Sequence, residues 1–591
     1  MWILVPILIT ISASFYLYSK WKFSYWRRKG FAYIEPEFIF GNTKQFFRNQ
    51  VSYGALFDEF YRKFKSMGLK YGGVYNFFKP ILIVTDLNLI KDLLQKDFEY
   101  FPNRGFYVDE ENDPLAGNLF CLEDEKWKAL RVKLNPTFSS GKVKMMHQII
   151  LECTTDLLDM LQTNSAQGNP VNVREAMMCF TTNVIGSVAF GIKCNTFKDP
   201  NSEFAKFSQT MIKLNFRNIL KMFIIPEYVP KWFLKKVGFR VIPKSLENFY
   251  KNLVTSTIDY REKNNIHRND FLHFLLQLKN LGKVTDDGTL CKDPSAKSLL
   301  TVNEIVAQCY IFFLAGSETS ATTISSALLE LAVNHDIQEK ARHEIREVLK
   351  KHNGEVTYEA LGDMTYLDLI MMETLRKHSP AAKLLRKCGK PYTIPGSNCV
   401  IEAGTSLIIP VYSIQRDPDI YPDPEQFDPE RFTSENKSKR HPCSFLSFGD
   451  ETLRKHSPAA KLLRKCGKPY TIPGSNCVIE AGTSLIIPVY SIQRDPDIYP
   501  DPEQFDPERF TSENKSKRHP CSFLSFGDGP RYCIGMRMGK LQIKIGLAEI
   551  LKNFKVFLNE RTSYPIEYES TLVSSVPKGG IWLNLEKIEK Y

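Results

Sequence analysis

Apolar residues form a nearly continuous run at the start of the chain. The run covers residues 2–18, and a basic, tryptophan-containing segment follows at 20–30. About seventeen apolar residues lie at the short end of what spans a bilayer, and a basic, aromatic flank is typical of the cytosolic interface. The pattern predicts a membrane signal-anchor helix over residues 1–19, a basic linker over 20–36, and a cytosolic globular part from residue 37 to 591.

The globular part mixes a few strand-like segments with longer helical patterns. Residues 74–86 have strand character and 87–95 helical character, and the longest helical pattern covers 301–331. Residues 202–244 alternate apolar runs with Lys and Arg, which fits either an ordinary amphipathic helix pair or a roof that lies against a membrane. We therefore expect a mainly α fold with a small β region (α+β), preceded by a single N-terminal transmembrane helix.

Composition narrows the classes of function. The chain has 591 residues, 43% hydrophobic and 24% charged, with a formal net charge of +12. The positive charge is not gathered into basic tracts with interleaved aromatic residues, so no nucleic-acid partner is expected, and a membrane surface or an acidic protein explains it better. The 13 cysteines include no CxxC pair. We read them as reduced thiols of a cytosol-facing protein.

One cysteine stands in a distinctive loop, FGDGPRYCIG at residues 526–535. Its fixed positions are Phe526, Gly529, Arg531, Cys533 and Gly535, and an amphipathic helical pattern follows. A thiolate just before a helix N-terminus is stabilised by the helix dipole and by unpaired backbone N–H groups. Flanking glycines leave room for a planar cofactor. The pattern predicts a thiolate ligand to haem iron, and the alternative is a buried free cysteine.

Three further constellations carry possible chemistry. Trp127 and Arg131 lie four residues apart on one helical face and can present an indole donor and a guanidinium to an anionic group; the alternative is a core tryptophan. Glu318 and Thr319 interrupt an apolar helix, which suggests a proton path. The alternative there is a threonine bonded back to its own helix beside a partly exposed glutamate. Glu373, paired with a nearby arginine in ETLR, is a weak signal by itself.

The cysteine loop resembles the haem-binding loop of the cytochrome P450 superfamily. Residues 519–556 look like those of microsomal members, particularly the family-six enzymes of insects. One departure is Ser525, where those relatives usually carry proline, but it removes no ligand. The resemblance implies the cytochrome P450 fold, haem b with Cys533 as the axial ligand, and a haem loop that includes Phe526 and Gly535.

The resemblance also assigns roles to the other motifs. It implies that propionate groups bind Trp127 and Arg131, together with the residues Arg386 or Arg464 and Arg531. It implies that Glu318 and Thr319 deliver protons during oxygen activation, and that Glu373 and Arg376 lock to the arginine of a PERF segment, Arg431 or Arg509. The loop over 103–120, which we expect to be mobile, would border the substrate.

An unusual feature is an exact tandem duplication. Residues 373–450 recur without a single difference as residues 451–528. Each copy carries ExxR (Glu373/Arg376 and Glu451/Arg454) and PERF, but only the second continues into the cysteine loop, so one haem site is expected. Only the first copy follows the apolar helix pattern of residues 366–372. We therefore expect Glu373 and Arg376 to form the buried pair and the surplus 78 residues to leave the fold. The polar loop 434–440 is the favoured exit, which makes Arg431 the favoured partner of Glu373 and Arg509 the alternative.

The function that the resemblance implies is monooxygenation at the endoplasmic reticulum membrane. Electrons would come from NADPH through a flavoprotein reductase, and a cytochrome b-type donor is a further possible partner. The reductase would dock on Lys126, Lys128, Lys540 and Lys544. The substrate would be lipophilic, a xenobiotic or an endogenous lipid. Two rivals stay open: a haem-thiolate isomerase or dehydratase that needs no reductase, and an inactive membrane-tethered pseudoenzyme caused by the duplicated block.

Overall fold

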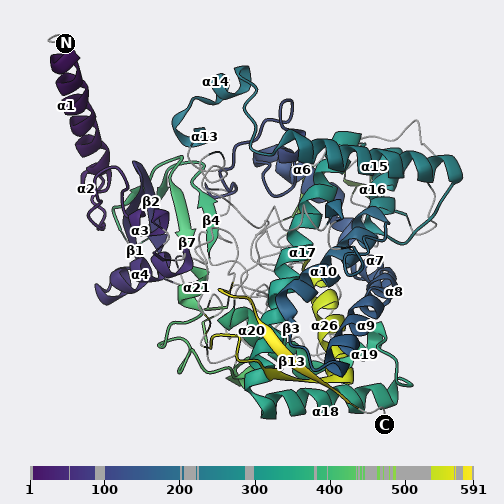
Figure 1. Cartoon of the computed structure of the whole chain (residues 1–591). Coiled ribbons are helices and arrows are strands. Elements are labelled where there is room, and N and C mark those ends of the chain that lie inside the picture. The colour runs from purple at the N-terminus through teal and green to yellow at the C-terminus, as the bar shows by residue number, and fades with distance from the viewer. Residues whose placement is uncertain are drawn as a thin grey trace.

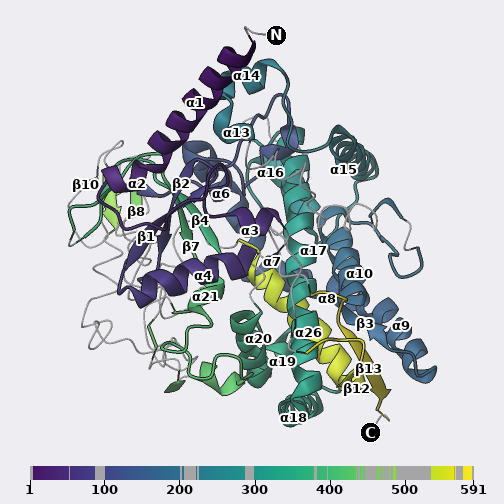
Figure 2. The same ribbon diagram turned by 60° about the vertical axis from the view of Figure 1, so that its left-hand side comes forward.

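The structure is a computed structural model of the whole chain, shown in Figures 1 and 2. The described residues are 4–48, 50–51, 53–86, 89, 100–199, 202–204, 221, 225–285, 290, 299–378, 383–395, 397–433, 435–436, 440–441, 444–445, 462–465, 470–471, 478–479, 484–487, 534–564, 566 and 577–588.

A β-rich region stands beside a larger helical region (Figure 1). Its main sheet has four strands in the order β1-β2-β7-β4, in which β1–β2 and β7–β4 are antiparallel and β2–β7 is parallel. Those strands are β1 (Tyr71–Asn76), β2 (Lys79–Val84), β4 (Leu384–Lys387) and β7 (Ser406–Ile409). The short helices around this sheet are α2 (Tyr25–Arg28), α3 (Lys44–Phe47), α4 (Tyr53–Ser66) and α21 (Val411–Ile414).

The helical region is arranged around α17 (Val302–Val333), which is buried over most of its length. A capping box fixes where it begins: Thr301 Oγ1 accepts the Glu304 N–H at 3.2 Å, and Glu304 Oε2 accepts the Thr301 N–H at 2.8 Å. Around it lie α6 (Asp124–Leu134), α7 (Ser140–Met145), α8 (His147–Glu152), α9 (Thr154–Ala166), α10 (Val173–Ile185), α15 (Lys244–Asn264), α16 (Phe271–Leu281), α18 (His335–Lys351), α19 (Tyr358–Asp363), α20 (Thr365–Lys377) and α26 (Met536–Asn553).

Short elements complete the fold. The three-stranded sheet β12-β13-β3 joins the end of the chain to the start of α10, and β5-β6 is a separate hairpin. The bounds are β3 (Val171–Asn172), β5 (Tyr392–Thr393), β6 (Val400–Ile401), β12 (Phe554–Leu558), β13 (Trp582–Lys587), η3 (Pro114–Ala116), η4 (Asn135–Phe138), η5 (Gly186–Phe190), η7 (Pro429–Phe432), α13 (Ile225–Tyr228) and α14 (Lys231–Lys236).

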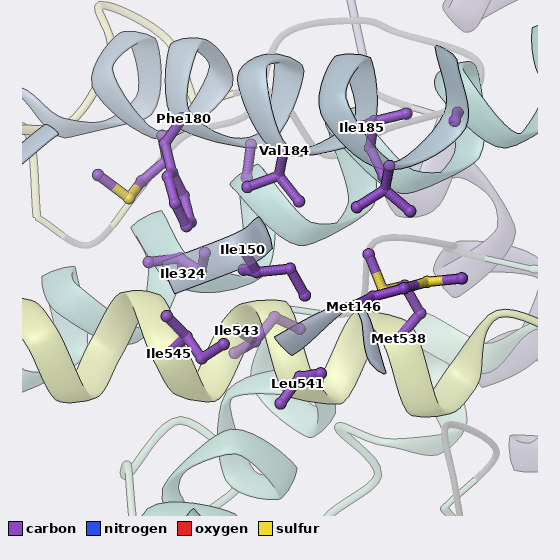
Figure 3. Close-up of a cluster of buried hydrophobic side chains, with 14 of the residues drawn as sticks. Met146, Ile150, Phe180, Val184, Ile185, Ile324, Met538, Leu541, Ile543 and Ile545 are labelled. Carbon is purple, nitrogen blue, oxygen red and sulfur yellow. The ribbon is translucent and has the colours of Figure 1, made fainter. Parts of the chain in front are cut away.

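The core forms where α10 and α26 face each other. Phe180 and Val184 of α10 point toward α26, and Ile324 of α17 lies between them (Figure 3). A Cβ at Gly546 of α26 would lie 3.2 Å from both Ile324 Cδ1 and Phe180 Cε1, so glycine permits this close helix approach. The same core fixes the start of α26, and with it the chain that leaves the cysteine loop.

One expectation for the N-terminal part needs correction. Residues 74–86 are not one strand, because the chain reverses between β1 and β2 and forms a hairpin. Of the helix expected over 87–95, only residue 89 lies in the described part of the structure. Helix α1 (Leu4–Phe23) does form at the N-terminus. Among the helices of the described residues, however, none combines the length and the apolar character needed to cross a membrane.

The loop over 103–120 is also different from the mobile segment that we predicted. Asp113 Oδ2 accepts the N–H groups of Val241 and Ile242, both at 3.0 Å. The Leu119 N–H donates to Gln308 Oε1 of α17 at 2.9 Å, inside the core. Because these buried polar groups are satisfied by partners far along the chain, the loop is tied to the helical region rather than left free.

The two copies of the duplicated block occupy different places. The first copy supplies β4 and β7 to the main sheet, whereas the strands of the second copy form two separate pairs, β8–β11 and β9–β10. Their bounds are β8 (Leu462–Lys465), β9 (Tyr470–Thr471), β10 (Val478–Ile479) and β11 (Ser484–Ile487).

The first copy stays packed beyond the loop at which we predicted that it would leave. Arg440 lies over the rings of Tyr421 and Phe432 at 4.5 and 4.8 Å. Tyr421 donates to the Ser444 carbonyl at 3.2 Å, and the ring centroids of Phe432 and Phe445 are 4.7 Å apart. Arg440 and Phe445 therefore still contact the first copy at and after the predicted exit point, and the expected exit at 434–440 is wrong.

Candidate functional site

The cysteine loop itself lies outside the described residues. This applies to Cys533 and also to Phe526 and Arg531, which the sequence analysis placed in the same loop. The described chain resumes at Ile534, and Gly535 is the N-cap residue of α26. A Cβ built on Gly535 would meet only one described atom, Phe138 Cε1 at 4.0 Å. Among the described residues, no side chain beyond its chain neighbours comes closer to this position, which is compatible with a planar group there.

Helix α17 carries a short exposed strip within its otherwise buried length. Ala315 and Thr319 are exposed, while Phe313, Ser317 and Ser320 between and beside them are buried. Ala315 and Thr319 lie four residues apart and so share one helical face. The Thr319 hydroxyl donates to the Ala315 carbonyl at 2.7 Å. Its oxygen lone pairs remain available to accept a hydrogen bond from a group in front of this strip.

Glu318 points to a different partner from Thr319. Its Oε1 lies 2.8 Å from Nη2 of Arg174, the second residue of α10, and the two side chains are 12% and 14% exposed. Thr322 Oγ1 is 3.5 Å from the same oxygen, and Oε2 is buried without a hydrogen-bond partner. The structure therefore contains the threonine back-bond that the sequence analysis kept as an alternative, but the glutamate is a paired, mostly buried group.

Three candidate propionate ligands are buried. Trp127 and Arg131 on α6 are 5% and 7% exposed, and Arg386 on β4 is 6% exposed. A network of backbone and side-chain bonds joins the two elements. The Lys387 N–H donates to the Asn103 carbonyl at 3.0 Å, and Asn103 Nδ2 donates to Asp124 Oδ1 at 2.8 Å. Asn103 thus holds the start of α6 beside β4, the strand that carries Arg386.

The donor chemistry of this region fits haem. Indole and guanidinium groups are hydrogen-bond donors without acceptor atoms, which suits the carboxylates of a propionate-bearing group. The exposed strip of Ala315 and Thr319 and the open start of α26 at Gly535 provide surfaces on which a flat ring can lie. Arg464, the second-copy counterpart of Arg386, lies in β8, outside the main sheet.

Behind this region, Glu373 and Arg376 form a fully buried bidentate ion pair. Arg376 Nε and Nη2 donate to the two carboxylate oxygens of Glu373, each at 2.7 Å. Arg376 also donates to the carbonyls of Gln415 at 2.9 Å and Gln426 at 3.2 Å. Burial raises the pKa of Glu373, and the Arg376 guanidinium opposes that shift. One arginine fork therefore connects α20 to the chain on both sides of residue 420.

The arginine of the first PERF segment reaches the same carboxylate. Arg431 Nε lies 3.5 Å from Glu373 Oε1, and its Nη1 and Nη2 donate to the carbonyls of Pro422 and Asp423 at 2.6 and 3.0 Å. Arg509, the alternative partner, lies outside the described residues, as do Glu451 and Arg454. The described part of the chain thus brings Glu373, Arg376 and Arg431 together.

One of the lysines proposed to contact a reductase cannot do so. Lys544 Nζ donates to the Met364 carbonyl at 3.1 Å and to Asp368 Oδ2 at 3.0 Å, and its side chain is 8% exposed. It ties α26 to α20 instead. Lys126 and Lys128 are 73% and 67% exposed and pair with Glu110 and Glu125. Lys540 is half-buried.

Sequence reasoning missed Arg174 and Asn103. Arg174 follows a short strand, and a single arginine at a helix start carries no signal that it will face a glutamate 144 positions later. Asn103 was read only as part of a polar loop. Both side chains matter because of the elements that they connect, α10 with α17 and β4 with α6, and these pairings exist only in three dimensions.

These features define a class of protein: a mainly helical, haem-binding fold in which one long helix crosses beside the cofactor region. A sequence profile described as Cytochrome P450 matches residues 36–450 and 450–584. The two matched segments meet at the last residue of the first copy.

Curated relatives agree with the profile. The chain is 35% identical over 587 residues to a protein of Musca domestica named cytochrome P450 6A1, covering 98% of this chain and 97% of the relative. It is 34% identical to cytochrome P450 6a2 of Drosophila melanogaster, with complete coverage of both chains. It is also 34% identical to a protein of the same fly named probable cytochrome P450 6a14, over 96% of each chain. The chain belongs to the cytochrome P450 family, whose members are haem-dependent monooxygenases with a cysteine thiolate ligand.

We predict that Arg376→Lys destabilises the fold and lowers haem retention. Lysine keeps the positive charge but cannot reproduce the fork that reaches Glu373 and two carbonyls. Losing two charge-assisted bonds in a buried place costs about 3 kcal/mol. The measurement is the midpoint of thermal unfolding by far-UV circular dichroism, together with haem bound per protein. Arg62→Lys is the matched control, since Arg62 is 61% exposed beside Asp58. Equal midpoints for the two variants would contradict this prediction.

Proposed function

We propose that the protein inserts one oxygen atom of O₂ into a lipophilic substrate, while the other oxygen leaves as water. Electrons come from NADPH through a flavoprotein reductase. The observation that carries the proposal is that neighbouring residues of α17 have different surroundings. A small-residue strip with Thr319 is exposed, whereas Glu318 is held in a mostly buried ion pair. Haem with a thiolate ligand, when bound, supplies the electron density that favours O–O cleavage.

Glu318 and Thr319 hold and orient protons in this scheme. Arg174 holds the Glu318 side chain beside α10, and rotation out of that ion pair would bring a carboxyl group toward the Thr319 side of the helix. The Thr319 oxygen accepts a hydrogen bond while its own O–H donates to the Ala315 carbonyl. In this proposal, Glu318 and Thr319 would deliver protons one at a time to the reacting oxygen from a fixed position.

The donor side chains near the haem site would hold the haem in position and exclude water from it. Trp127, Arg131 and Arg386 bind the two carboxylates, and their burial keeps these interactions strong. Arg531 joins them from the cysteine loop in our proposal. Lys126 and Lys128, exposed near the start of α6, form the docking face for an acidic reductase or a cytochrome b-type donor.

We also place the protein on the endoplasmic reticulum membrane, with its catalytic part in the cytosol. Along α1, apolar side chains are exposed from Val5 to Trp21. Phe15 of α1 contacts Phe78 of the β1–β2 turn at 5.9 Å, and the Phe78 N–H donates to Tyr228 Oη of α13 at 3.2 Å. Figures 1 and 2 show α13 and α14 at the same end of the molecule as α1. Exposed Trp232 on α14 extends this apolar surface, which supports the membrane roof considered from sequence.

The membrane surface can be tested by a charge substitution. We expect Trp232→Glu with Phe233→Glu to lower binding to phosphatidylcholine vesicles about tenfold or more, because two large apolar side chains no longer enter the lipid. Trp232 and Phe233 are 69% and 45% exposed, so the fold should tolerate the change. Tyr260→Glu on α15 is the matched control at 62% exposure. Equal vesicle binding by both proteins would contradict the proposed surface.

A carbon-monoxide difference spectrum of the reduced protein tests the central assignment. We expect the thiolate-type band in the parent, and its loss together with all turnover in Cys533→Ser, while expression stays similar. A Cys533→Ser protein that keeps the band would place the ligand elsewhere. A parent without the band would favour the haem-free pseudoenzyme. Turnover that needs neither NADPH nor reductase would favour the isomerase or dehydratase, although the intact Glu318–Thr319 pair argues against it.

Thr319→Ala should uncouple electron supply from product formation. NADPH would still be consumed, but more of the oxygen would emerge as hydrogen peroxide, because the Thr319 hydroxyl oxygen, the hydrogen-bond acceptor on the exposed strip, is lost. We expect the ratio of product to NADPH to fall about tenfold with the carbon-monoxide band retained. Thr322→Ala, one turn further along on the buried side, is the control. Unchanged coupling in Thr319→Ala would remove this residue from the proton path.

A further inference from the structure

The strand pairs of the two copies are identical in register. In the first copy, Leu384 lies opposite Ile409 and Lys387 opposite Ser406. In the second, Leu462 lies opposite Ile487 and Lys465 opposite Ser484. The smaller hairpins agree in the same way: β5 pairs with β6 and β9 with β10 at corresponding residues. The described strands of the second block therefore pair as their counterparts in the first block do, although they lie outside the main sheet.

The edge of β2 determines which hairpin enters the sheet. Strand β2 runs parallel to β7, with Leu82 opposite Leu407 and Ile83 opposite Ile408. All four side chains are at most 2% exposed. In the second copy, β11 has the same sequence as β7 and, among the described strands, pairs only with β8. The edge of β11 that does not face β8 corresponds to the edge of β7 that pairs with β2.

The two hairpins would make the same contacts with β2. Every side chain that β7 and β4 present to the sheet has an identical counterpart 78 positions later. Exchange also leaves a surplus of the same length, and the cost of closing a loop depends only weakly on where it begins. The two arrangements therefore differ mainly at their junctions, so neither is excluded by contact energy.

We propose that the β2 edge is a binding surface for two alternative segments of this chain, and that hairpin β8–β11 replaces β4–β7 there in a substantial fraction of molecules. The bidentate pair of Glu373 and Arg376 belongs to α20 in both arrangements, since only the first copy continues this helix. The inference does not depend on haem chemistry.

The experiment uses Leu407→Asp, Leu485→Asp and the double variant of the full chain. An aspartate at the buried position opposite Leu82 excludes its own hairpin from the sheet. Folding is read by hydrogen exchange of peptides from α17, which needs neither haem nor activity. To tell the copies apart, Val400→Ile or Val478→Ile is added as a mass tag, because peptides 400–409 and 478–487 are otherwise identical. Val400 is 39% exposed, so the tag is mild.

We expect each single variant to keep at least half of the parent's folded fraction, and the double variant to lose it about tenfold. In Leu407→Asp, the protected fraction of peptide 478–487 should rise at least threefold as the second hairpin enters the sheet. Two results would overturn the proposal. One is that Leu407→Asp alone is as damaging as the double variant while peptide 478–487 stays unprotected. The other is that the double variant folds like the parent.

Discussion

The buried ion pair between Glu373 and Arg376 is the constraint on which the rest of the structure depends. One guanidinium satisfies a carboxylate and two backbone carbonyls from distant segments, with no exposure to water. A buried charge without such partners would cost several kcal/mol, roughly the whole net stability of a domain. Helix α20, the segment around residue 420 and the PERF turn must therefore come together as a unit.

Helix α17 has two different sides: one packs against the scaffold, and the other carries the candidate site. Most of its surface is packed against α10, α20 and α26, which fixes its position to within side-chain contact. From Ile305 to Val333, only the small strip at Ala315 and Thr319 is exposed. Glu318 is adjacent in sequence but rotated toward Arg174, so an acid and an alcohol that are neighbours along the chain have separate partners. Rigid packing on one side is what makes a precisely placed acceptor possible on the other.

The duplication shows how strongly context decides between equal sequences. The second block forms strands with the register of the first, so hairpin formation is encoded locally. Membership of the main sheet is not, because it depends on the single edge that β2 offers. The first copy also stays bound through Phe445, since Arg440 and Phe445 both contact Phe432.

The sequence by itself determined the long helix over 301–331, the helix after the cysteine loop, and the pairing partners available to Glu373. These depend on periodicity and i,i+3 spacing, which a chain carries in its own order. The tertiary structure decided that 74–86 is a hairpin, that Lys544 is buried against Asp368, and that Arg174 holds Glu318. The positions of Lys544 and Arg174 depend on surfaces that meet across more than a hundred residues, and local patterns contain no record of those meetings. The hairpin is local, but its reversal at Phe77 and Phe78 carries no glycine or proline turn signal in the sequence.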